Sequence, residues 1–179
     1  RAGAADPDGL ATFAALYAGT MRRRGASAYH RFSADHFTAL AAGLGDGLGL
    51  VEVVAAERVV AAALFTFAPT SGMAGYHLAA TVPGPPRGAT KLVVAEGRRI
   101  ARERGLARLI LGGGLGSAED ALFSFKSGFG GARHRFRTLR LVLDGTEYAA
   151  RCARAGVDPA SEGYFPAHRA PAGTVLGVG

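Results

Sequence analysis

A run of three glycines, Gly112 to Gly114, follows a short apolar segment at Ala107–Leu111. Glycines at the end of a strand let another backbone or a ligand approach closely, because they carry no side chain. Ser117, with Asp120 three residues later, then fits a helix N-cap with a supporting acid. The free N–H groups at the start of such a helix attract an oxyanion. The segment therefore predicts a turn that suits acyl or phosphate chemistry.

The helix predicted after this turn carries a lysine on its apolar side. The apolar residues and the lysine recur with helical spacing at Leu122, Phe125, Lys126 and Phe129. A lysine in such a position is partly desolvated, which favours either an anionic partner or a lowered pKa. The alternative is that the Lys126 ammonium reaches solvent near the end of the helix, where it complements the helix dipole.

The composition is that of a globular protein with one domain, or one domain with a tail. The chain has 179 residues, of which 49% are hydrophobic and 20% are charged. Its longest apolar run, Val59–Phe65, is far too short to span a membrane, and the first residues lack the apolar core of a signal peptide. The single cysteine, Cys152, excludes an internal disulfide and fits a reducing compartment, so we expect a cytoplasmic protein. Because the chain starts with Arg1 rather than methionine, a preceding domain can be missing here.

The chain is strongly basic, with a formal net charge of +7 and a pI near 10.3. This charge favours anionic partners such as RNA, nucleotide phosphates or anionic lipid headgroups. The positive charge gathers in three segments, Arg22–Arg24, Arg98–Arg104 and Arg133–Arg137. The alternative is a solvated surface, with arginines that protect an exposed strand edge. No aromatic-interleaved RNA motif accompanies the arginines, so the composition alone does not establish RNA binding.

Hydrophobic periodicity and turn residues predict a succession of helices and strands. The expected helices cover Leu10–Met21, Ser33–Leu44, Ala89–Arg104, a short segment around Lys126, and Glu147–Ala155. The expected strands cover Leu50–Ala55, Val59–Phe67, Ala74–Thr81, Ala107–Leu111 and Phe136–Leu143. This order predicts an α/β fold with a mixed β-sheet flanked by helices on both faces. We expect one domain over residues 1–156 and an irregular tail, rich in Ala, Gly and Pro, over residues 157–179.

This order, with a glycine-containing loop between a central strand and a long helix, resembles the GNAT acyltransferase fold. Several segments also resemble landmarks of the Fem family, the aminoacyl-tRNA-dependent transferases of peptidoglycan bridge synthesis. These segments are residues 25–37, Tyr76–Leu78, Leu111–Gly114, Leu122–Phe129 and Phe165–Arg169. The resemblance covers most of the chain, and the Leu-Gly-Gly-Gly and Phe-Lys-x-x-Phe motifs are its more specific parts.

The sequence departs from each of these patterns at one point. Fem transferases generally have two such domains, and this chain resembles only the second. Acetyl-CoA users of the GNAT fold usually carry a Gln/Arg-x-x-Gly-x-Gly/Ala loop for the pyrophosphate. The matching positions here are Pro85, Gly88 and Thr90, so only the middle glycine is present. This departure weakens an acetyl-CoA interpretation and leaves room for a different activated acyl donor.

The resemblance also implies where an acyl group would be held. In this fold two neighbouring parallel strands splay apart, and the matching strands here are Ala74–Thr81 and Ala107–Leu111. The free amides near Ala79 and Ala80 are then candidate oxyanion donors for the substrate carbonyl. In Fem transferases the lysine that matches Lys126 is thought to stabilise charge that develops on the aminoacyl ester.

Two neighbouring positions on the same strand are further candidates. Tyr76 and His77 must face opposite sides of the sheet, and His77 shares its side with the small Ala79, which leaves room for a substrate. A hydrogen-bonded core histidine is at least as good an interpretation of His77. Arg87 and Gly88, ahead of the long helix, can meet a donor phosphate or simply form a helix-entry turn.

The remaining substrate-binding candidates lie in the glycine turn and in the helix predicted after it. Gly112, Gly113 and Gly114 can admit the backbone or ribose of a donor, or else form a strand-to-helix turn with positive φ. Phe125 is a candidate for the same site, with a place in the core as its alternative. No metal-ligand spacing and no nucleophile elbow is visible, so a direct transfer without a covalent enzyme intermediate is expected.

The sequence therefore predicts an acyltransferase, with Lys126 and His77 as its catalytic candidates. The expected reaction moves an aminoacyl group from aminoacyl-tRNA to an amine of a peptidoglycan precursor or a peptide-like metabolite. One alternative is an N-acyltransferase that uses acyl-CoA or an acyl carrier protein, and another is a non-catalytic half of a two-domain transferase. No tightly bound cofactor is expected, and the donor is a substrate. No residue clearly takes the proton of the amine.

Overall fold

The computed structural model describes residues 1–114, 118–130 and 132–171. Its contacts divide the chain into two compact units, residues 1–131 and 132–179. The domain boundary expected at residue 156 stays a prediction. Among the described residues, no helix combines the length and the apolar character that crossing a membrane requires.

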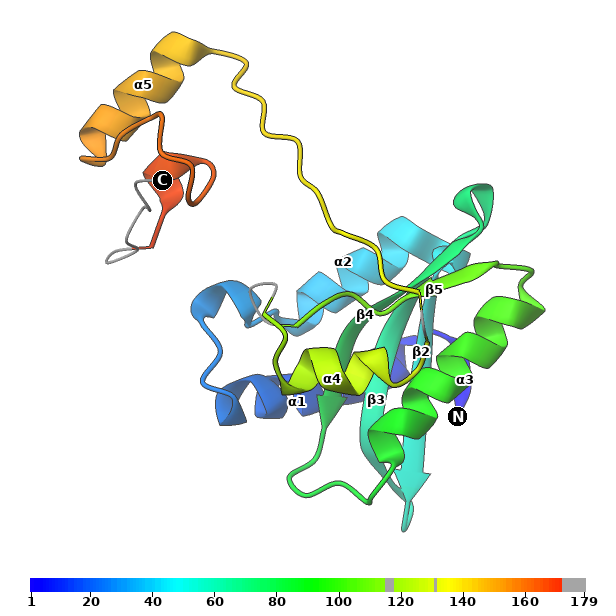
Figure 1. The fold of residues 1–179 in the computed structure, drawn as a ribbon. Helices are drawn as coiled ribbons and strands as arrows, with labels where there is room; N and C mark the ends of the chain where they lie inside the picture. The colour runs from blue at the N-terminus through cyan, green and yellow to red at the C-terminus, as the bar shows by residue number, and fades with distance from the viewer. Residues whose placement is uncertain (115–117, 131, 172–179) are drawn as a thin grey trace. The chain divides into compact units, whose positions relative to one another are not determined.

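The first unit is built on a five-stranded sheet with the strand order β1-β2-β3-β4-β5 (Figure 1). The strands are β1 (Ala2–Ala4), β2 (Leu48–Ala55), β3 (Arg58–Ala68), β4 (Met73–Thr81) and β5 (Arg108–Ile110). Neighbouring strands are antiparallel except for β4 and β5, which run parallel. The predicted mixed sheet is therefore confirmed. Strand β1 has no sequence signal, because its small residues show no hydrophobic alternation.

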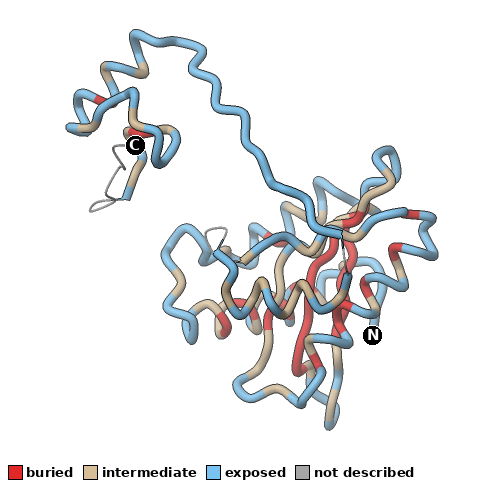
Figure 2. Tube along the Cα trace, viewed as in Figure 1, coloured by how far each residue is buried: buried red, intermediate tan, exposed pale blue. Residues whose placement is uncertain are grey.

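Helices cover both faces of this sheet, as the sequence predicts. Helices α1 (Pro7–Arg23) and α2 (Ala34–Leu44) pack on one face, and α3 (Ala89–Glu103) packs on the other (Figure 1). The buried residues concentrate in the central strands and on the sides of the helices that face them (Figure 2). Shorter helices complete the unit: η1 (Ala28–His30), η2 (Gly45–Gly47), η3 (Pro69–Ser71) and α4 (Ala121–Ser127).

Side-chain caps start both helices on the first face. Asp6 accepts a hydrogen bond from the N–H of Gly9 at 2.7 Å, and Ser33 accepts one from the N–H of His36 at 3.3 Å. Such caps satisfy backbone donors that the first helical turn leaves unpaired. Helix α1 ends in arginines, whose charge complements the C-terminal end of the helix dipole. The start predicted for α2 at Ser33 is confirmed by its cap, whereas α1 starts at Pro7, ahead of the predicted Leu10, because Asp6 caps it.

Helix α3 lies close to the sheet because its inner face carries small residues. Gly97 faces Phe65 of β3, and a Cβ atom at Gly97 would overlap the Phe65 ring. Val93 and Ala101 on the same face are also buried. This packing anchors α3 and, with it, the loop that joins β4 to α3.

In the second unit, helix α5 (Gly145–Arg154) confirms the helix predicted at Glu147–Ala155, and η5 covers Ala167–Arg169. The two elements are joined by a hydrogen bond of 3.1 Å from the N–H of Ala167 to the hydroxyl of Tyr148. The predicted irregular tail is described only to residue 171, and it contains η5.

The strand predicted around Phe136–Leu143 is wrong. Residues 132–144 form neither helix nor strand, and the side chains of Phe136, Leu139 and Leu143 are 83–90% exposed. A strand needs a neighbour that completes its backbone hydrogen bonds, and no described strand pairs with this segment. The alternating apolar pattern therefore records a β preference without the partner that would realise it.

Candidate active site

Strands β4 and β5 pair over only three residues each. Residues 73–75 pair with residues 108–110, and β4 then continues to Thr81 without β5 beside it. Because the two strands are parallel, the residues after Gly75 and those after Ile110 leave the paired region at the same end. The pairing of the two strands therefore stops early, as the splayed strands implied by the sequence resemblance would require.

A β-bulge interrupts β4 where this separation begins. Leu78 pairs with Leu64 of β3 and Tyr76 pairs with Phe65, so that His77 is the extra residue. Tyr76 and Ala79 consequently both pack against the core on the α3 side of the sheet. Strict alternation, which would place Tyr76 and Ala79 on opposite sides, therefore fails here, because the bulge shifts the alternation by one residue. Bulges of this kind commonly lie next to functional sites.

Backbone hydrogen bonds show which amides of β4 face the open side. The N–H of Val82 donates to the carbonyl of Val60 in β3 at 3.0 Å, whereas the N–H of Thr81 turns away from β3. Since backbone groups alternate along a strand, the N–H of Ala80 points to β3. The N–H of Ala79 points to the other side, where β5 has ended. Of the two candidate oxyanion donors, this geometry favours Ala79.

A buried threonine of α1 closes the edge of β4 just beyond Ala79. Thr20, which is 4% exposed, accepts from the N–H of Thr81 at 3.0 Å, and its hydroxyl lies 2.9 Å from the carbonyl of Leu16 and 3.0 Å from that of Thr81. The guanidinium of Arg23 also donates to the carbonyl of Thr81. Sequence reasoning misses Thr20, and its only signal is a polar residue on the inner face of an amphipathic helix.

Tyr76 lies half-buried on the α3 side, with its ring 5.5 Å from the ring of Phe65. Burial raises the pKa of Tyr76 to about 12, and the charge of Arg24 acts in the opposite direction. The hydroxyl therefore stays protonated at neutral pH and can donate a hydrogen bond.

His77 reaches solvent at the bulge, but part of its ring is desolvated. This desolvation lowers the pKa of His77, and the nearby charge of His36 lowers it further. A histidine with a lowered pKa is largely neutral at pH 7 and can accept a proton. The electrostatic effect of His36 on the pKa of His77 has no sequence signal.

Lys126 lies against the glycine turn, as the sequence suggests that it can. Its ammonium Nζ donates to the carbonyl of Gly113 at 2.8 Å, and a Cβ at Gly112 would lie 3.5 Å from the same nitrogen. Burial lowers the pKa of Lys126, and the charge of Asp120 partly offsets this. Gly112 has a φ of +72°, the left-handed region that favours glycine.

The helix that carries Lys126 starts later than predicted. Asp120 itself is the N-cap and accepts from the N–H of Phe123 at 2.8 Å, whereas Ser117 lies outside the described residues. Phe125 is half-buried and meets Phe129 edge-on, with 5.2 Å between ring centroids. Helix α4 contains no fully buried residue. Its apolar side therefore contributes less to the core than the periodicity indicates.

The start of α3 offers positive charge and unpaired amides. Arg87 and Gly88 are exposed, and Gly88 is an N-cap with a φ of +89° and open space where a Cβ would be. The N–H of Ala89 donates to the carbonyl of Pro86, but no acceptor among the described residues meets the N–H groups of Thr90 and Lys91. An anion would find both charge and donors here.

In the described part of the chain, no group of three or more His, Cys, Asp or Glu residues is arranged to hold a metal ion. The described site therefore offers backbone amides, a neutral histidine, a tyrosine hydroxyl and a partly desolvated lysine. These groups can hold a carbonyl, accept a proton and stabilise a developing negative charge.

Comparison with known proteins identifies the fold. No protein-family model and no curated protein matches the sequence. Solved structures that match include an acetyltransferase of Trypanosoma brucei (18% identity, TM-score 0.54) and a ribosomal-protein-alanine N-acetyltransferase of Brucella melitensis (15%, 0.57). An aminoglycoside acetyltransferase from an uncultured soil sample also matches (12%, 0.60). These matches cover 79–80% of this chain and 95–99% of the other chains.

At such identities the likeness establishes the fold alone. No feature of the Fem family is shown by these structures. The mixed sheet with helices on both faces is the fold that this chain shares with these acetyltransferase structures.

Proposed function

We propose that the chain is an N-acyltransferase that moves an acyl group directly from an activated donor to an amine. The observation that carries this proposal is the early end of the β4–β5 pairing. Past that point, the N–H of Ala79 and the bulged His77 come from one strand, and the glycine turn at 112–114 comes from the other. The chain shares its fold with acetyltransferases, and an acyl carbonyl held at this point would have the N–H of Ala79 as a donor.

The proposed chemistry assigns one role to each group. The N–H of Ala79 donates to the carbonyl oxygen, on which negative charge develops as the amine attacks. A C–N bond forms, the bond from the acyl carbon to its leaving group breaks, and the leaving group takes up a proton. His77 accepts the surplus proton of the amine, because its lowered pKa keeps it neutral near pH 7. Tyr76 is the available hydrogen-bond donor on the α3 side of the sheet.

We assign an acyl thioester of coenzyme A as the donor substrate. The exposed Arg87 and the open start of α3 suit a pyrophosphate, because a charged side chain and free backbone N–H groups converge there. The names of the neighbouring structures refer to acetyl transfer, which involves a small acyl group. Because Pro85 and Thr90 depart from the usual pyrophosphate motif, the pyrophosphate would be bound mainly by backbone amides and Arg87.

Aminoacyl-tRNA is the second candidate donor, supported by one contact. Lys126 lies 2.8 Å from the carbonyl of Gly113, where it would stabilise charge on an ester in the glycine turn. The net charge of +7 suits a polyanionic donor. The acceptor is then an amine of a peptidoglycan precursor or a peptide-like metabolite, in a cytoplasmic reaction.

Isothermal titration of the chain with acetyl-CoA and, separately, with an aminoacyl-tRNA tests this assignment. We expect binding of acetyl-CoA that weakens in Arg87→Ala and is unchanged in Arg98→Ala, an exposed arginine of α3. Transfer to a panel of primary amines should follow. Binding of aminoacyl-tRNA alone would favour the second donor, and binding without any transfer would indicate the non-catalytic half of a larger transferase. An absence of binding to both donors would overturn the proposal.

A further inference from the structure

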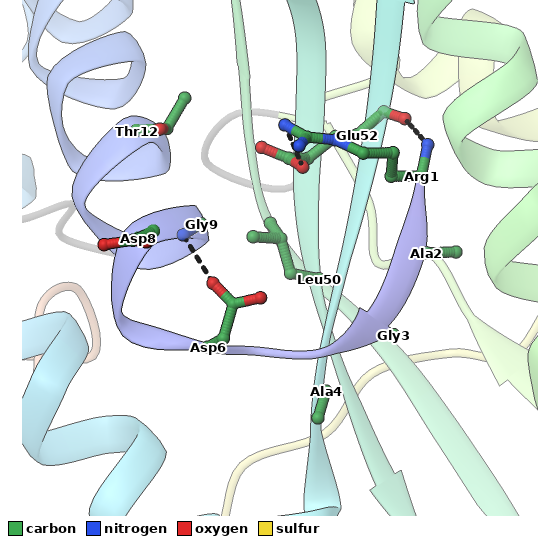
Figure 3. A pocket seen from close by; sticks show the side chains of 10 residues that line it. All are labelled: Arg1, Ala2, Gly3, Ala4, Asp6, Asp8, Gly9, Thr12, Leu50 and Glu52. Atoms are coloured by element: carbon green, nitrogen blue, oxygen red, sulfur yellow. Dashed lines mark hydrogen bonds and ion pairs between the residues drawn. The ribbon is translucent and has the colours of Figure 1, made fainter.

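A cavity of about 390 Å³ lies between the start of helix α1 and strands β1 and β2 (Figure 3). Its wall includes the side chains of Arg1, Asp6, Asp8, Thr12 and Glu52. Strand β3 separates β2 from β4, so this cavity is distinct from the candidate acyl-transfer site. It carries three carboxylates against one guanidinium, in a chain that is otherwise strongly basic.

Glu52 is the unusual member of this wall, because its side chain is only 7% exposed. One carboxylate oxygen, Oε2, pairs with the guanidinium of Arg1 at 3.1 Å. The other, Oε1, is buried and has no hydrogen-bond partner among the described residues. It points away from Arg1, toward the side of the cavity where Thr12 and helix α1 lie (Figure 3). A buried carboxylate oxygen without a donor is unfavourable, and it creates a demand for N–H groups.

Arg1 meets this demand poorly. Its side chain is 72% exposed, and its recorded ion pair reaches only one of the two oxygens of Glu52. A guanidinium binds a carboxylate best through two parallel N–H···O bonds, which use both oxygens. The main chain of Arg1 is fixed to β2 through the carbonyl and the N–H of Glu52. Arg1 and Glu52 therefore lie directly opposite each other on neighbouring strands, and the Arg1 side chain reaches the carboxylate from its exposed side.

We propose that this cavity binds a small guanidinium compound that displaces the side chain of Arg1 and donates to both oxygens of Glu52. The carboxylates of Asp6 and Asp8 add negative charge to the wall and favour the cation over an anion or a neutral molecule. Asp6 already accepts from the N–H of Gly9, so its charge contributes while its position stays fixed. The hydroxyl of Thr12 offers a further acceptor on the opposite wall (Figure 3). This site does not depend on the proposed acyl transfer.

An NMR titration of the whole chain with ethylguanidinium chloride tests the proposal, with tetramethylammonium chloride at the same ionic strength as the matched control. Both ions carry one positive charge, but only ethylguanidinium has N–H donors. We expect saturable shifts of the backbone amides of Gly9, Leu50 and Glu52 with ethylguanidinium alone. Equal shifts with both salts would mean a general ionic effect and would overturn the proposal.

Four variants extend this titration. Glu52→Gln keeps the shape of the side chain and should abolish saturable binding, whereas Glu57→Gln, on the exposed β2–β3 turn, should leave it unchanged. Arg1→Ala removes the internal competitor and should tighten binding severalfold. If Glu52→Gln does not fold, Asp8→Asn should still weaken binding. Weaker binding in Arg1→Ala, or unchanged binding in a folded Glu52→Gln, would overturn the proposal.

Discussion

Lys126 combines two properties that seldom meet in one lysine. Its ammonium is partly desolvated, which lowers its pKa, and it donates to a backbone carbonyl in a turn made of glycines. A cation held in this way is ready to exchange the carbonyl of Gly113 for an oxygen of a substrate that carries more negative charge. Its position therefore fits the stabilisation of a transition state better than the support of the fold, because no residue of α4 is fully buried.

The Lys126→Ala variant should keep the fold and lower the rate of acyl transfer by about 100-fold, the usual loss when one charge-stabilising donor is removed. Steady-state kinetics with the donor identified by titration measures this effect, and circular dichroism verifies the fold. Arg58→Ala, at an exposed cation on the β2–β3 turn, is the matched control and should transfer at the normal rate. A folded Lys126→Ala enzyme with the normal rate would exclude this role.

The pH dependence of transfer should report the protonation of His77. Desolvation and the charge of His36 both disfavour the imidazolium, so the pKa of His77 lies below the ordinary value of about 6.5. As the base, His77 must be neutral, and the rate should rise with pH through a midpoint below that value. His36→Asn removes one cause of the shift and should move the midpoint upward. His134→Asn, at an exposed histidine of the second unit, should not move the midpoint. A midpoint that is unchanged in His36→Asn would contradict the assignment of His77 as the base.

At the scale of elements, helix α1 extends from the cavity at Glu52 to the open edge of β4. Its N-terminus borders the cavity at Glu52, and its C-terminal half reaches the edge of β4 through Thr20. Thr20 replaces a neighbouring strand for one residue, since it satisfies both the N–H and the carbonyl of Thr81. The open edge at Ala79 is thus bounded by β5 on one side and by α1 on the other.

The Thr20→Val variant keeps the shape of the side chain but leaves the N–H of Thr81 without its partner, whereas the carbonyl of Thr81 keeps the bond from Arg23. We expect the free energy of unfolding to fall by about 1–3 kcal/mol, the cost of unsatisfied buried polar groups. Urea denaturation measures this change. Thr38→Val is a close control, because Thr38 makes the same backward bond within its helix, to Ala34, at an exposed position. Equal losses in the two variants would show that the bond to β4 contributes nothing.

At the scale of the whole molecule, the chain consists of two units joined through a segment without helix or strand. Residues 132–144 lack regular structure, although they contain the alternating apolar and arginine residues of a strand. Backbone without secondary structure is more accessible to a protease than the same residues in a helix. A protease should therefore cleave after arginines of this segment more readily than after arginines of a helix.

Limited trypsin digestion should therefore cut first at Arg135 and Arg137, and mass spectrometry of the earliest products should find fragments that end there. The arginines of α3, Arg98 and Arg102, are equally exposed as side chains but are held in a helix, and they serve as internal controls. Earliest cleavage within α3 would contradict this description of the two units.

Much of the site follows from local sequence, and the rest depends on pairing between distant strands. The glycine turn, the helix around Lys126, and the loop at Arg87 and Gly88 are local features, and the sequence indicates each of them, although the N-cap of that helix is Asp120 and not the predicted residue. The bulge at His77 is not local, because it is defined only by the register of β4 against β3. Without that register, the alternation rule places Ala79 on the wrong side. The bonds of Thr20 to Thr81, 61 positions apart, are hidden for the same reason.

The sequence by itself determined the order of the longer helices and strands from α1 to α4, the mixed sheet and the two covered faces, because hydrophobic periodicity and capping act over a few residues. Only the tertiary structure decided which amide of β4 is open, where the β4–β5 pairing stops and which carboxylate is buried without a partner. These properties depend on which distant segments meet, and a strand pattern states a preference for pairing without naming the partner. Residues 136–143 make the point directly, since their pattern predicts a strand that no described neighbour completes. Lys126 contacts the glycine turn at residues 112–114 because the short helix α4, close to the turn in sequence, carries it.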